Sequence, residues 1–271
     1  MNSASPNADW KQPPVIEVVL GVQFDPLPAL TNGHLGWFWG EMHEKFPTSD
    51  DAPPIPRMVE EFGETLFGFA ALDLRPQTGD SRLRMSSADR TQMVQVQNGW
   101  LIANWMKKQG HDYPGFTGVN KLFKKTSASF ATFLDSRELG VLTPNLWEVT
   151  YVDHIPKGTV WDSLEDLPRV FPGLFGSGLC PKGSHEAVNA TWTWCLGPET
   201  PGRLRLSVQS ARTSTSPAID VLLVKSIARG PMGYEGCPSL EVCLNLGRSA
   251  VVDTFRGLAS DEAKSHWAGS D

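Results

Sequence analysis

The sequence contains no apolar run that approaches the roughly 20 residues of a membrane-spanning helix, so we expect no membrane span. Its first 13 residues lack the charged and then apolar segments of a signal peptide. Only four cysteines occur, at positions 180, 195, 237 and 243, and none forms a C-x-x-C pair. Because 271 residues can build a core without cross-links, we predict reduced thiols in a cytoplasmic protein, with Cys195 as a small buried side chain.

The common catalytic and nucleotide-binding motifs are also missing. The chain has no G-x-x-x-x-G-K-[ST], no G-x-G-x-x-G after a strand, no H-E-x-x-H and no G-x-S-x-G. Among the six histidines, His34 and His43 share a predicted helix but stand nine residues apart, which places them on opposite faces. We therefore predict neither a metal site nor a cofactor.

Positive charge is scarce overall. Twenty-four Lys and Arg stand against 30 Asp and Glu, which gives a net charge of −6. This balance disfavours an extended nucleic-acid interface but leaves room for a local basic face. The composition is 40% apolar, which is typical of a folded chain, and the length suits one large core or two domains.

Short segments recur in the same order in the two halves of the chain. Residues 14–19 (PVIEVV) reappear in outline as 145–150 (NLWEVT), with Glu17 and Glu148 in register. Residues 82–86 (RLRMS) are echoed by 203–207 (RLRLS), and an Arg-Thr pair follows each of them. Together the two echoes predict an internal duplication that divides the chain near residue 140.

The clearest local pattern is a β-hairpin over residues 92–105. Asn98-Gly99 suits a two-residue turn with positive φ angles, and alternating residues flank it. Counting outward pairs Val96 with Leu101, Val94 with Ala103 and Gln95 with Ile102. The remaining patterns predict strands over 15–24, 62–72, 82–87, 146–155, 186–196, 203–209 and 219–227, and helices over 30–46, 119–134, 161–171 and 244–267.

These elements predict an α+β fold with two related halves. Each half runs strand, helix, antiparallel strands and long helix, and the helices cover one face of the strands. The strands form either one continuous curved sheet or two sheets. We expect a disordered tail over residues 1–13, a first repeat over 14–140 and a second repeat over 141–271.

Several of these segments carry a resemblance to a known family. The strand motif P-x-x-E-V in "PVIEVVLGVQF", the segments "HLGWFWGEMHEKFP" and "LWEVTYVDHIPKG", and a last helix ending in His266-Trp267-Ala268-Gly269 resemble a sporadically distributed family of bacterial proteins of similar length. The resemblance covers nearly the whole chain and carries no catalytic signature, so it assigns no role to any residue. The patchy distribution of the family favours a role in bacterial defence or conflict.

Two glutamates are the weak candidates for catalysis. Glu17 and Glu148 occupy the same position in otherwise apolar strands, and paired carboxylates share protons or bind cations. The alternative is that each glutamate lies on the solvated face of the sheet or pairs with an arginine.

Four arginines and two tryptophans are the candidates for binding. Arg82 and Arg84 share one face of their strand, as do Arg203 and Arg205, and guanidinium groups suit carboxylate or phosphate. Trp37 and Trp39 lie on different sides of their predicted helix, so one is available to a protein partner.

We therefore expect a non-catalytic cytoplasmic binding or adaptor protein that recognises a protein or an anionic partner, with a nucleic acid as a further class of partner. The alternative is an enzyme that acts on a phosphate-bearing or other anionic substrate, with a Glu or a His as general base. A cleft that holds Glu17 or Glu148 beside an arginine or a histidine favours the enzyme. A flat face lined by arginine and tryptophan favours the adaptor. The oligomeric state stays open.

Overall fold

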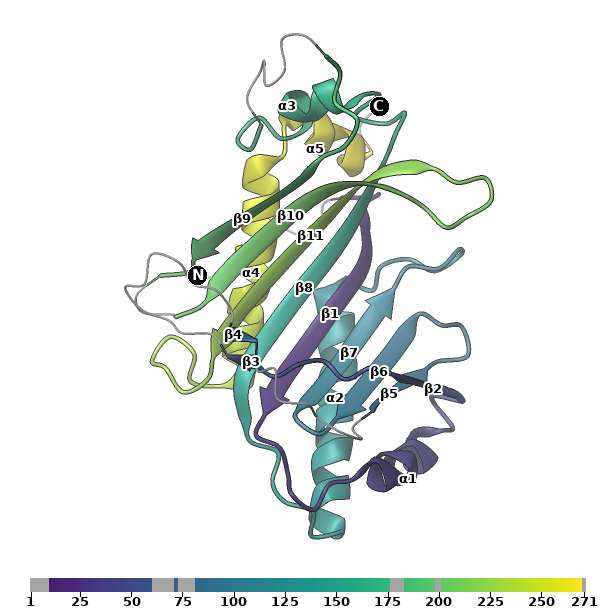
Figure 1. Ribbon diagram of the computed structural model, residues 1–271, viewed down its shortest axis with the longest axis vertical. Coiled ribbons are helices and arrows are strands. Elements are labelled where there is room, and N and C mark those ends of the chain that lie inside the picture. The colour runs from purple at the N-terminus through teal and green to yellow at the C-terminus, as the bar shows by residue number, and fades with distance from the viewer. Residues whose placement is uncertain (1–9, 60–70, 73–80, 176–182, 198–200, 270–271) are drawn as a thin grey trace.

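The computed structural model describes residues 10–59, 71–72, 81–175, 183–197 and 201–269, and their fold is α+β (Figure 1). The strands are β1 (Val15–Phe24), β2 (Thr48–Ala52), β3 (Met58–Val59), β4 (Ala71–Leu72), β5 (Arg82–Ser86), β6 (Gln92–Gln97), β7 (Trp100–Met106), β8 (Pro144–Pro156), β9 (Asn189–Cys195), β10 (Arg203–Arg212) and β11 (Asp220–Pro231). The helices are α1 (Asn32–Met42), α2 (Gly115–Ser136), the 3₁₀ turn η2 (Leu164–Asp166), α3 (Leu167–Val170), α4 (Leu240–Leu258) and α5 (Asp261–Ala268).

Nine strands form one continuous antiparallel sheet in the order β2-β5-β6-β7-β1-β8-β11-β10-β9, and β3 and β4 form a separate pair. The sheet therefore joins the N-terminal and C-terminal halves of the chain through β1 and β8, its central neighbours. None of the described helices is long and apolar enough to cross a membrane.

The long helices pack behind the sheet. Helix α2 contacts β7 and β1, whereas α4 contacts β8 and β11, and both lie on the same side in Figure 1. Successive side chains of β8 point to opposite faces of the sheet, and Trp147, Val149 and Tyr151 are buried on the side of the helices. These apolar side chains form the surface on which the helices pack. We call this side the helix face and the opposite side the open face.

Trp147 is the largest completely buried side chain among the described residues, and two glycines make room for its ring. A Cβ atom on Gly247 of α4 would lie 2.5 Å from Cζ3 of the indole. A Cβ atom on Gly230 of β11 would lie 2.7 Å from its Cζ2. The close approach of α4 to the sheet therefore depends on these two glycines.

The predicted hairpin is confirmed in its register. Val96 pairs with Leu101, Val94 with Ala103 and Gln95 with Ile102, and Gly99 has a φ of +108°.

Some predicted boundaries are wrong, each for a local reason. The helix expected over 161–171 shortens to η2 and α3, because Ser163 caps its start and the chain leaves the helix before Pro172. The strand expected over 62–72 lies mostly outside the described residues. Residues 1–9 of the expected disordered tail also lie outside them. Trp10, in contrast, packs against Phe255 and Trp267.

A short stretch of chain crosses the open face. The side-chain amide of Gln23 accepts from the N–H of Met58 at 2.7 Å and donates to its carbonyl at 3.1 Å. Gln97 makes the same two bonds to Ile55, at 2.7 and 2.8 Å. The two side-chain amides bind the backbone N–H and C=O groups of this stretch, as the backbone of a neighbouring strand would. They therefore hold Ile55 and Met58 against the open face of the sheet.

The cysteine prediction is wrong for three residues, since Cys237 and Cys243 are not reduced and Cys195 is not buried. Cys237 and Cys243 form a disulfide and are both buried. Cys237 precedes α4 and Cys243 lies in its first turn, and their Cα atoms are 5.0 Å apart, within the usual range for a disulfide. Cys195 is exposed because β9 is the edge strand, and Cys180 lies outside the described residues. Since disulfides are rare in the cytosol, the cysteines no longer support a cytoplasmic location.

We expect reduction of the disulfide to lower the free energy of unfolding by about 2 kcal/mol, because cross-linking restricts the unfolded chain. Urea denaturation with and without dithiothreitol measures the difference. A Cys243→Ser variant should unfold as the reduced protein does. Equal stability of the oxidised and reduced forms would contradict the expectation.

Candidate ligand-binding cavity

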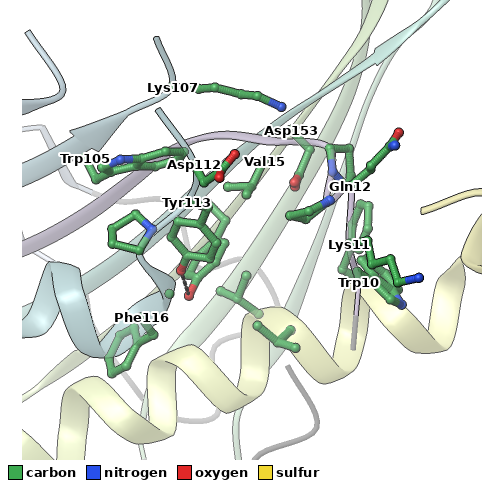
Figure 2. A pocket seen from close by; sticks show the side chains of 18 of the residues that line it. Trp10, Lys11, Gln12, Val15, Trp105, Lys107, Asp112, Tyr113, Phe116 and Asp153 are labelled. Atoms are coloured by element: carbon green, nitrogen blue, oxygen red, sulfur yellow. Dashed lines mark hydrogen bonds between the residues drawn. The ribbon is translucent and has the colours of Figure 1, made fainter. Parts of the chain in front are cut away.

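A cavity of about 640 Å³ lies on the helix face, near the N-terminal end of β1 (Figure 2). Its walls come from the N-terminal segment, the loop between β7 and α2, the middle of β8 and the C-terminal half of α4. Its volume falls in the range of small-molecule sites in proteins.

The N-terminal segment is fixed in place as one wall. The backbone N–H of Gln12 donates to the carbonyl of Trp267 at 3.0 Å, and the N–H of His154 donates to the carbonyl of Pro14 at 3.0 Å. The ring of Trp10 lies 5.1 Å from that of Trp267. These contacts hold residues 10–14 between α5 and β8.

Aromatic rings make up much of the lining. The rings of Trp105 and Tyr113 lie 4.9 Å apart on one side, and Phe255 lies 6.0 Å from Trp10 on the other. The aromatic residues of the lining are Trp10, Trp105, Tyr113, Phe116, Tyr151 and Phe255. Such walls suit a planar or apolar organic molecule, since their faces stack on rings and attract cations.

Asp153 brings a carboxylate into this lining. It follows Trp147, Val149 and Tyr151 in the alternation of β8, so it points toward the helices where an apolar residue is the rule. Figure 2 shows its side chain directed from the strand into the cavity.

The Asp153 carboxylate has no hydrogen-bond donor or cation as a partner among the described residues. Burial alone raises its pKa from 3.8 to about 7. A buried carboxylate without a partner is costly, and such groups concentrate at functional sites.

Two tyrosine hydroxyls form the second polar feature. Tyr113 Oη and Tyr151 Oη lie 3.1 Å apart and share a hydrogen bond, drawn dashed in Figure 2. Burial raises the pKa of both phenols above the usual value, so both stay neutral. Neutral hydroxyls can donate to or accept from a bound molecule.

Charged side chains surround the outer part of the cavity. Lys11, Lys107 and Asp112 line it from exposed positions, and Figure 2 shows both ammonium groups directed away from the tyrosine hydroxyls. The guanidinium of Arg256 lies 5.3 Å from the ring centre of Trp10. These three cations therefore lie at the rim, whereas Asp153 lies inside. A fourth cation, Arg248, interacts with the Tyr151 hydroxyl and lies over the Phe116 ring.

The two predicted glutamates lie outside this cavity and do not form a pair. Glu17 accepts from Asn104 Nδ2 at 2.6 Å, and Glu148 accepts from Arg229 Nε at 2.8 Å. Glu17 lies opposite Val152, four residues along β8 from Glu148. That separation is about 13 Å, too far for a shared proton.

The structure does not bring the two predicted arginine pairs together. Both pairs project on the open face, but β5 and β10 are separated by five strands. Arg203 is buried rather than exposed, beside Arg229 in the register of β10 and β11. Neither Arg203 nor Arg205 is free of a partner.

Arg84 forms an exposed ion pair with Asp50 of the edge strand β2. We expect Arg84→Gln to change the free energy of unfolding by less than about 1 kcal/mol, because exposed ion pairs contribute little. Urea denaturation measures the change, and a loss of several kcal/mol would contradict this interpretation.

The two predicted tryptophans separate in the structure. Trp39 donates from Nε1 to the carbonyl of Phe46 at 2.9 Å and packs against the core, so its role is structural. Trp37 is 61% exposed, with its ring against that of His34. Only Trp37 therefore remains available to a protein partner, and that role stays a prediction.

The sequence analysis did not identify Asp153, although its position in β8 carries a signal. Positions 147, 149, 151 and 155 are all apolar or aromatic, so the carboxyl at 153 interrupts the buried side of the strand.

Among the described residues, no group of three or more His, Cys, Asp or Glu could hold a metal ion. No protein-family model matches the chain, and no curated protein matches it either. The functional argument therefore depends on the geometry of the cavity.

Proposed function

We propose that the protein is a non-catalytic binding protein that holds a small organic molecule in this cavity. The observation that carries the proposal is the Asp153 carboxylate, which is buried at the wall without a partner. A bound molecule with a hydrogen-bond donor would supply that partner. The aromatic lining and the volume support a ligand with an organic ring.

Three probes of similar size test the proposal: neutral indole, cationic benzamidine and anionic phenylacetate. We expect saturation-transfer NMR to detect binding of at least one of them to the wild-type protein. Val252 lines the cavity, so Val252→Trp should place an indole ring inside it and abolish binding. Val242, which is 41% exposed at the start of α4, gives the matched control Val242→Trp, which should bind normally.

Amide chemical shifts provide a second readout that needs no variant. The bound probe should shift the signals of the lining residues Tyr113, Tyr151 and Asp153. The proposal is overturned if no probe binds, if binding survives in a folded Val252→Trp protein, or if the shifts map elsewhere.

An enzyme is the second candidate, and a specific observation favours it. A carboxyl group with a pKa of about 7 is suited to act as a general base near neutral pH. No histidine is present in the described lining, and the predicted bases Glu17 and Glu148 lie elsewhere. Mass spectrometry of any molecule that co-purifies, before and after incubation, separates the candidates, because only an enzyme converts it.

We further propose that the two halves are related by duplication. In the first half the strands beside β1 are β7, β6 and β5, and in the second half the strands beside β8 are β11, β10 and β9. In both halves, therefore, the last strand in sequence lies next to the first, and the others follow in reverse order. Helix α2 follows β7 as α4 follows β11. Arg82 lies in β5 and Arg203 in β10, and these strands are not equivalent in this scheme. The similarity between residues 82–86 and 203–207 therefore does not support the duplication. Superposition of residues 14–140 on 141–269 tests the proposal.

A further inference from the structure

We propose that the ligand of the cavity is an organic cation, an amine or amidine attached to an aromatic body, whose charged group binds Asp153. The inference rests on the proposed function and adds the chemical class of the ligand. It follows from three features of the lining: the unpartnered carboxylate, the aromatic rings and the position of the protein's own cations.

The Asp153 carboxylate indicates the charge and the hydrogen-bonding character of the ligand group that binds it. An ionised carboxylate only accepts hydrogen bonds, so the ligand must donate. A neutral donor would leave the negative charge of Asp153 uncompensated in a buried site, whereas a cation neutralises it and forms a charge-assisted hydrogen bond. The Tyr113 hydroxyl, which shares a hydrogen bond with Tyr151, can accept a further N–H group, whereas the Tyr151 hydroxyl also interacts with Arg248.

The aromatic walls favour the same class. Cations are attracted to the faces of Trp, Tyr and Phe rings within about 6 Å of the ring centre. Six aromatic residues line the cavity, and a ligand with its own ring would stack on them.

The protein's own cations do not compete for the carboxylate. Lys11 and Lys107 are exposed at the rim, and the Arg256 guanidinium lies against Trp10. Arg248 interacts with the Tyr151 hydroxyl instead, and burial is the only influence on the pKa of Asp153. The rim also favours an anionic group at the outer end of the ligand, away from Asp153.

Ligand binding should depend on the protonation of Asp153. The other titratable or charged groups around the cavity are Lys11, Lys107, Asp112, Tyr113, Tyr151, Arg248 and Arg256. Burial raises the pKa of Asp153 to about 7, within the range from pH 6 to 8, and His154 lies on the opposite face of β8. Asp153 is therefore the group that gives the affinity for a cation its pH dependence between pH 6 and 8.

Calorimetric titration at pH 8 tests the inference with the same three probes. We expect benzamidine to bind at least tenfold more tightly than indole or phenylacetate, and about tenfold more weakly at pH 6 than at pH 8. Asp153→Asn should remove both the preference and the pH dependence. Asp253→Asn, which removes an exposed carboxylate of α4 that does not line the cavity, should keep both.

The outcomes separate the two proposals. If indole or phenylacetate binds as tightly as benzamidine and Val252→Trp abolishes this binding, the inference fails while the proposed function stands. If Asp153→Asn keeps its fold and still prefers benzamidine, the inference fails as well. If none of the three probes binds, the proposed function itself is wrong.

Discussion

Asp153→Asn should stabilise the ligand-free protein by about 4 kcal/mol above pH 7 and have almost no effect near pH 3. The folded-state pKa is raised from 3.8 to about 7, so the folded protein binds this proton more tightly than the unfolded chain does. The stability contributed by the protonated carboxyl is complete below pH 3.8 and is lost as the pH rises to 7. A shift of about three pKa units corresponds to about 4 kcal/mol.

Urea denaturation at pH 4, 6 and 8 measures this difference, which should increase over that range. The control is Asp112→Asn, whose effect should stay within about 0.5 kcal/mol because the side chain is exposed. An Asp153→Asn protein that is less stable than wild type at pH 8 would show that the carboxylate has a structural partner. A stabilising substitution would instead mark Asp153 as a residue kept at the expense of stability, as functional residues often are.

Trp147→Ala should lower the free energy of unfolding by about 3–5 kcal/mol, the usual loss for a large aromatic side chain removed from a core. Its indole is completely buried between the sheet and α4, where Gly230 and Gly247 leave room for it. Urea denaturation followed by circular dichroism measures the loss. Trp37→Ala is the control, with little effect, because that ring is 61% exposed.

Gly247→Ala tests the contact between α4 and Trp147 by adding a methyl group to the helix. The added methyl group would lie 2.5 Å from the Trp147 ring, so we expect a loss of about 1–3 kcal/mol. A loss below 1 kcal/mol for Trp147→Ala would contradict the tight contact between α4 and β8.

The parts of the fold that the sequence predicted depend on local patterns. The β6–β7 hairpin follows from Asn98-Gly99 and the alternation beside it, and its register matches residue for residue. Helix α2 follows from apolar residues at spacings of three and four. The contact between β1 and β8 joins residues about 130 positions apart, and no local pattern encodes which strands meet.

The candidate site was not predicted, for the same reason. Asp153 is separated by about 40 residues from Tyr113 and by about 100 from Arg256, and only the fold brings them around one cavity. The predicted arginines and glutamates followed patterns within single strands. Their partners, such as Arg229 for Glu148, come from neighbouring strands that the sequence could not identify.

The central claim is that Asp153 is an unpartnered carboxylate in a cavity that binds an organic cation. Carbon-13 NMR of the side-chain carboxyl, titrated from pH 4 to 9 with and without benzamidine, tests it most directly. We expect a midpoint near pH 7 for the free protein, since burial raises the pKa of Asp153 to about 7. Saturating benzamidine should lower that midpoint by at least one pH unit, because a bound cation favours the ionised carboxylate. A midpoint near pH 4 in the free protein, or one that benzamidine leaves unchanged, would contradict the claim.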